Sequence, residues 1–181
     1  MNRIEPVELL LGLTEVTPDG TLLAGRYTPL DHECALQRLM PATVAKAVDI
    51  VIGGPYSSGV LAGTHFEYQK ASPEIVAKVE RIKAVAQRHD VPTRADPLQF
   101  SRAHPTCAAV LPGASRPERI AEDHAALKAV IPADFWREMR KPELVAANAP
   151  LPIDQWSKED SSWRKHPPAS TLRSRPIRCG N

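Results

Sequence analysis

Short apolar runs alternate with longer amphipathic stretches along this chain. Three of the runs, at residues 21–24, 48–52 and 107–111, have the length and the apolar content expected of buried β-strands. Between the second and the third, apolar residues recur at helical spacing from Ser72, a favoured N-cap residue before a proline, to His89. Because strands that alternate with helices favour parallel βαβ units, the pattern predicts three parallel strands with helices on their outer side and no closed barrel.

Weaker periodicity predicts five further helices. They are expected at residues 7–13, from Asp31 to Met40 with an interruption at Pro41, at 98–103, beyond Ser115 as the N-cap, and at 134–139. Residues 146–181 form a proline-rich, basic stretch that is expected to be a disordered C-terminal tail. The chain is therefore divided into a folded part, 1–145, and a tail. The scattered charges of this tail are typical of a solvated terminus rather than of a nucleic-acid-binding arm.

The composition excludes several classes of protein. The 181 residues are enough for one domain with a real core, and 43% of them are apolar. A formal net charge of +2 indicates no nucleic acid as a partner. No apolar segment is long enough to span a membrane, no signal peptide is recognised, and the three cysteines lack the CxxC spacing of a metal site. We therefore expect a cytoplasmic protein with no membrane partner and no bound metal.

The candidate chemistry lies in two loops that follow predicted strands. The first, Gly53–Leu61, reads GGPYSSGVL, and its glycines allow close approach of the backbone to a ligand while Tyr56 offers a flat ring face. The second, Pro112–Arg119, reads PGASRPER and places arginines at a helix start. Together they suggest a nucleotide whose phosphate lies near the second loop. The alternative is an ordinary turn and an ordinary helix start, since neither loop matches a P-loop or a GxGxxG fingerprint.

Four motifs in a fixed order make the chain recognisable. They read LAGRYTPLD at 23–31, GGPYSSGVL at 53–61, LQF followed by AHP within 98–105, and LPGA at 111–114. In these motifs residues 7–145 resemble the aldo/keto reductase superfamily, most of all its L-fucose dehydrogenase and D-threo-aldose 1-dehydrogenase group, which includes pyridoxal 4-dehydrogenase-like proteins. Members of this superfamily are (β/α)8 TIM barrels that use NAD or NADP. The resemblance implies an α/β fold that is a partial barrel, comprising the last three or so strand-helix units.

The resemblance also implies twelve cofactor-binding residues. Tyr56 would stack on the nicotinamide ring, Arg119 would contact the 2′-phosphate region, and Asp123 stands where the family has an asparagine near adenine. An aspartate cannot donate the hydrogen bond that an asparagine amide donates. The full set is Tyr56, Ser57, Ser58, Gly59, Leu61, Gly113, Ala114, Ser115, Arg116, Arg119, Glu122 and Asp123.

The family's catalytic Asp, Tyr, Lys and His lie in the first half of the barrel, and no residue of this sequence matches them. No catalytic residue is therefore assigned. The resemblance implies an NAD(P)-dependent aldose dehydrogenase acting on a sugar or an aldehyde, here truncated and inactive as an isolated chain. Self-association or pairing with a missing N-terminal half is expected, because incomplete sheets present unpaired edges. The alternatives are a non-enzymatic nucleotide-binding or interaction protein and an inert gene remnant.

Overall fold

A small parallel sheet organises the molecule, which is described here from a computed structural model. The described residues are 3–13, 18–57, 65–66, 69–141 and 144–154. The sheet contains β1 (Gly20–Ala24), β2 (Asp49–Gly53) and β5 (Cys107–Leu111) in the order β1-β2-β5, and both neighbouring pairs are parallel. The predicted three parallel strands are confirmed. The sheet is open and is compatible with part of a (β/α)8 barrel.

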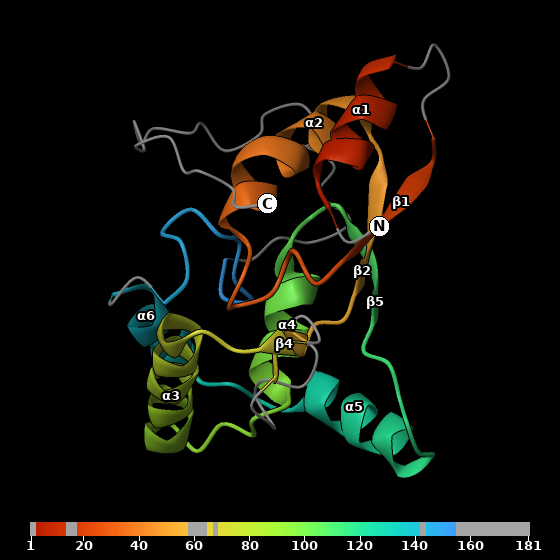
Figure 1. Ribbon diagram of the computed structural model, residues 1–181. Helices are drawn as coiled ribbons and strands as arrows, with labels where there is room; N and C mark the ends of the chain where they lie inside the picture. Colours follow the sequence, from red (N-terminus) through yellow and green to blue (C-terminus); the bar gives the residue numbers. More distant parts are fainter. Residues whose placement is uncertain (1–2, 14–17, 58–64, 67–68, 142–143, 155–181) are drawn as a thin grey trace.

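Seven helices and one short ladder complete the described part of the chain. The helices are α1 (Glu5–Leu13), the π-helix η1 (Ala35–Leu39), α2 (Met40–Lys46), α3 (Pro73–Arg88), α4 (Ala95–Ala103), α5 (Glu118–Lys128) and α6 (Ala133–Arg140). The ladder, which the sequence did not predict, pairs β3 (His65–Phe66) with β4 (Gln69–Lys70) in antiparallel fashion. In the view of Figure 1, α1, α2 and α4 lie on the same side of the three strands. Helix α3 packs on α6, and α4 packs on α5.

The two faces of the sheet differ in burial because side chains alternate along each strand. Leu23, Ile50 and Ile52 share one face of the sheet by their register and are 0% exposed. On the opposite face Leu22 is 39% exposed and Leu111 is 50% exposed. The described helices therefore cover one face of the sheet and leave apolar surface on the other.

Helix α3 confirms the prediction made from its start signal. Ser72 is its N-cap, and the Ser72 side chain accepts a hydrogen bond from the Ile75 amide at 3.4 Å. The helix ends at Arg88, with His89 in the C-cap position, as expected before Val91-Pro92. Local sequence was sufficient here because both end signals act within one turn of the helix.

Two predictions about helix ends were wrong. Pro41 does not interrupt its helix, since η1 continues directly into α2. A proline has no N–H to donate, and the widened turn just before it, closed by a bond from the Met40 amide to the Ala35 carbonyl, lets the chain continue. Ser115 does not cap α5, which begins at Glu118 with Pro117 in the N-cap position and no side-chain cap. The Pro117 ring holds φ at −57°, so helical geometry begins there and not at the serine.

A buried histidine ties the end of the described chain to the loop after β1. The Nε2 atom of His32 accepts a hydrogen bond from the Ala146 amide at 2.9 Å, so Nδ1 carries the proton and donates to the Thr28 carbonyl at 2.9 Å. Ala149 and Leu151 are also buried in the core. The packed part of the structure thus extends beyond residue 145, whereas residues 155–181 of the predicted tail lie outside the described residues.

Candidate functional site

The carboxyl ends of the three parallel strands meet at one edge of the sheet, where ligands of open parallel sheets usually bind. The Gly25 amide donates to the Gly53 carbonyl at 2.8 Å, and the Gly54 amide donates to the Leu111 carbonyl at 3.0 Å. The backbone φ angles of Gly25, Gly54 and Gly113 are +72°, +61° and +72°, a region that residues with a Cβ atom rarely adopt. Glycine is therefore required at each strand end by the turn itself, with or without a ligand.

Ser57 joins the loop after β2 to the loop after β1. Its side-chain hydroxyl lies 2.9 Å from that of Thr28, and both residues are buried. Ser57 also has a positive φ of 50°. In this structure its side chain holds two loops together and its backbone amide donates to the Gly54 carbonyl at 3.0 Å, so both groups of Ser57 already have protein partners.

Tyr56 lies in a cluster with Asp123 of α5 and with Arg94, which precedes α4. The Tyr56 phenol donates a hydrogen bond to Asp123 Oδ1 at 2.5 Å, and the Arg94 guanidinium forms an ion pair with the same oxygen. The Arg94 guanidinium carbon also lies 4.4 Å from the centroid of the Tyr56 ring, a cation–π distance. Burial, reinforced by the bond to Asp123, raises the pKa of Tyr56 above its ordinary value. The phenol is therefore a neutral donor at neutral pH.

Arg119 and Glu122 form the outer part of this cluster. The Arg119 guanidinium lies 3.1 Å from the Glu122 carboxylate, and Arg94 Nε lies 3.8 Å from it. Two arginines are thus balanced by two carboxylates, Glu122 and Asp123. The structure brings together Tyr56, Arg119, Glu122 and Asp123 of the predicted set. The resemblance assigned Tyr56 to the nicotinamide ring and Asp123 to adenine, at opposite ends of a dinucleotide, so it did not imply the direct bond between them.

The other predicted residues are not part of this cluster. Gly113, Ala114, Ser115 and Arg116 are exposed in the loop between β5 and α5. Ser58, Gly59 and Leu61 lie outside the described residues.

Arg94 was missed by the sequence analysis. It lies in a short Val91–Arg94 connection between two helices, where an arginine looks like any solvated surface residue. Its two partners in the site are far away in the sequence: Asp123 follows it by 29 residues and Tyr56 precedes it by 38. No local pattern signals such a contact. Only the packing of α4 against α5 brings the guanidinium to the tyrosine ring.

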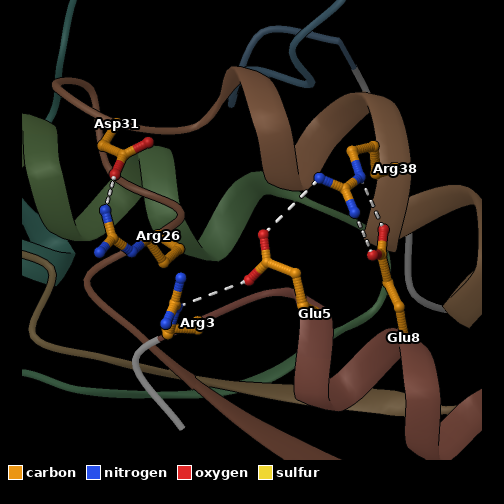
Figure 2. Close-up of polar contacts among 6 residues, drawn as sticks. All are labelled: Arg3, Glu5, Glu8, Arg26, Asp31 and Arg38. Carbon is orange, nitrogen blue, oxygen red and sulfur yellow. Dashed lines mark hydrogen bonds and ion pairs between the residues drawn. The ribbon is translucent and has the colours of Figure 1, made fainter. Parts of the chain in front are cut away.

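A second polar group, shown in Figure 2, has a structural role. Arg38 of η1 bonds Glu8 and lies 3.7 Å from Glu5, which pins α1 to the following helix. Beside it, Arg26 pairs with Asp31 at 2.8 Å and closes the loop after β1. These are partly exposed ion pairs, and pairs of this kind contribute little to stability individually.

Several ionisable groups are buried away from this cluster. Burial raises the pKa of Asp96 to about 8, lowers that of His32 to about 4 and lowers that of His104 to about 3. The two histidines are therefore neutral at neutral pH. Among the described residues, no group of three or more His, Cys, Asp or Glu side chains could hold a metal ion. No helix in the same part of the chain is both long and apolar enough to cross a membrane.

Comparison with known proteins finds two similar dehydrogenases. No family model matches the chain. A stretch of 116 residues is 32% identical to pyridoxal 4-dehydrogenase of Microbacterium luteolum, covering 61% of this chain and 34% of that protein. A stretch of 121 residues is 32% identical to D-threo-aldose 1-dehydrogenase of Pseudomonas sp, covering 64% of this chain and 36% of that protein. These matches confirm the resemblance to the aldo/keto reductase-like dehydrogenases, and they span about a third of each relative's length.

Proposed function

We propose that this chain forms the cofactor-binding part of an NAD(P)-dependent dehydrogenase of the aldo/keto reductase type. The observation that carries the proposal is the convergence of Tyr56 with Arg119, Glu122 and Asp123 at the carboxyl edge of a parallel sheet. The names of the two relatives support a dehydrogenase, and dehydrogenases of this kind transfer hydride to or from a nicotinamide cofactor.

The side chains present fit a dinucleotide. The Oδ2 atom of Asp123 has no partner, and because this atom is buried it could accept a hydrogen bond from a base amino group only after the cluster opens. Tyr56 supplies an aromatic face for stacking, and Arg119 near the start of α5 supplies a cation for a phosphate. The Arg119–Glu122 ion pair occupies part of the guanidinium, so Glu122 competes with a phosphate for Arg119.

When bound, the nicotinamide ring accepts or donates a hydride, and this part of the chain binds and orients it. Proton transfer is assigned to no described residue. The Tyr27 hydroxyl is buried without a partner, and the Tyr56 hydroxyl is bound to Asp123. We infer that the substrate of the whole protein is an aldose or another aldehyde, as the names of the relatives suggest.

An interaction role is the second candidate, and the exposed sheet face favours it. Leu111 is 50% exposed beside an edge of the described sheet, where backbone groups are available for pairing. We propose that this face associates with a second copy of the chain or with a polypeptide that supplies the other strands of a barrel.

Calorimetric titration of the full chain with NAD⁺ and NADP⁺ tests the cofactor proposal. Wild type is expected to bind at least one of them. Tyr56→Leu, which removes the ring, should weaken binding by roughly fivefold, as expected for loss of one aromatic stacking contact. Tyr56→Phe keeps the ring and serves as the matched control for stacking. Absence of binding by folded wild type would refute the proposal and leave the interaction role as the better explanation.

A further inference from the structure

We propose that Arg94 is a positioning residue that fixes Tyr56 to Asp123, so that the loop after β2 and helix α5 respond together to a ligand. Three segments that are distant in sequence meet at one carboxylate oxygen. Tyr56 follows β2, Arg94 precedes α4, and Asp123 lies in α5. The inference concerns the site of the proposed function, but the coupling itself is a property of the chain without a ligand.

Arg94 contacts Tyr56 through a cation–π interaction and Asp123 through an ion pair. Its guanidinium covers one face of the Tyr56 ring at 4.4 Å and pairs with Asp123 Oδ1. The Tyr56 phenol reaches the same oxygen at 2.5 Å. A ring held at its face and at its hydroxyl cannot rotate without disturbing α5, so its orientation depends on Arg94.

Burial makes this arrangement depend on the arginine charge. The Asp123 side chain is 7% exposed and the Arg94 side chain is 26% exposed. A buried carboxylate that loses its cation is strongly disfavoured unless other groups move to compensate. Arg94 therefore stabilises the carboxylate that in turn anchors the tyrosine.

The network is also incompletely hydrogen-bonded. Asp123 Oδ2 and Arg94 Nε are buried and neither has a hydrogen-bond partner. Buried polar atoms without partners are uncommon, and a ligand can supply the missing bonds if the cluster opens to admit it. Because both atoms belong to residues that contact Tyr56, a ligand that binds there must also change the surroundings of the tyrosine ring.

Fluorine NMR of the full chain labelled with 3-fluorotyrosine tests this inference. The chain has three tyrosines, so Tyr56→Phe assigns the Tyr56 signal. Arg94→Gln removes the charge, Arg94→Lys restores it without the planar guanidinium, and Arg102→Gln changes an exposed arginine of α4 as the matched control. We expect Arg94→Gln to move the Tyr56 signal and leave the buried Tyr27 signal in place, with Arg94→Lys lying between wild type and Arg94→Gln.

The outcomes separate the inference from its alternatives. If the Tyr56 signal is the same in Arg94→Gln as in wild type, or if Arg102→Gln moves it equally, the inference is wrong. If Arg94→Gln also displaces the Tyr27 signal, the fold is altered, and Arg94→Lys then decides: a Tyr56 shift with unchanged Tyr27 supports positioning, and no shift overturns it. For a cofactor bound by wild type, Arg94→Gln should weaken affinity by about fivefold. If wild type binds none, the proposed function fails while the tyrosine signal still tests Arg94.

Discussion

His32 should make the stability of this protein depend on pH in a predictable direction. Its ring is 1% exposed and makes one hydrogen bond through each nitrogen, which only the neutral ring can do in this arrangement. Burial lowers the pKa of His32 from 6.5 to about 4. We predict that His32→Gln, whose amide can also donate and accept but does not titrate, makes the protein less sensitive to acid.

The sign follows from proton binding. Between pH 6.5 and 4 the unfolded chain binds a proton at His32 and the folded chain does not, so acid favours unfolding. The stabilising contribution is complete above pH 6.5 and is lost as the pH falls through the folded-state pKa. At 1.36 kcal/mol for each unit of pKa difference, the loss is about 2 kcal/mol at pH 5 and about 3 kcal/mol at pH 4.

Other buried ionisable groups also make the stability depend on pH, so the effect of His32 must be measured as the difference between wild type and the His32 variant. His104, whose pKa is lowered to about 3, adds a loss of the same sign, whereas the raised pKa of Asp96 acts in the opposite direction. The quantity to measure is the free energy of unfolding in urea, for wild type and for His32→Gln, at several pH values from 7.5 to 4.5. The gap between the two proteins should change by about 2 kcal/mol between pH 7.5 and pH 5.

A matched control is His124→Gln, because His124 is exposed on α5. Its curve should stay parallel to that of wild type over the same range. If the His32→Gln curve is also parallel to wild type, then His32 is not a buried neutral ring, and the bond that ties residues 144–151 to the β1 loop is not formed as described.

Further predictions concern the sheet-edge cluster and the exposed sheet face. Arg119→Ala should weaken NADP⁺ binding about tenfold or more in calorimetry and NAD⁺ binding less, since a charge-assisted hydrogen bond contributes ~1.5–3 kcal/mol; equal losses would show that Arg119 does not contact the 2′-phosphate. Glu122→Gln frees Arg119 from an ion pair of about 0.2–1 kcal/mol and should tighten NADP⁺ binding by up to about fivefold, and unchanged affinity would contradict this. Leu111→Lys should lower the mass measured by light scattering if the exposed face mediates self-association, and a monomeric wild type would exclude that role. The chain should show negligible oxidation of L-fucose or other aldoses with NAD(P)⁺, because no described residue is assigned to proton transfer and acid–base catalysis typically contributes ~10²–10⁴-fold to the rate. A normal rate would mean that a residue present here transfers the proton.

Helix ends and glycine turns show which features local sequence could predict. Ser72 was recognised as an N-cap because its bond to the Ile75 amide spans three residues. The loops after β2 and β5 were recognised because each contains a glycine that the strand-end turn requires. Pro41 was misjudged because the π turn that accommodates it depends on how the helix packs, with Ala35, Leu36 and Leu39 all buried.

The strands and helix α3 could be predicted from the sequence because their hydrophobic patterns repeat over two to four residues. The cluster that defines the candidate site could be predicted only in part. Motifs placed Tyr56 and Asp123 in one site by resemblance, but the bond between them joins residues 67 apart, and Arg94 entered the site without any local signal. His32 and Ala146 are 114 residues apart. Contacts of this kind exist only once helices and sheet have packed, since packing alone decides which distant polar groups are buried together and must satisfy one another.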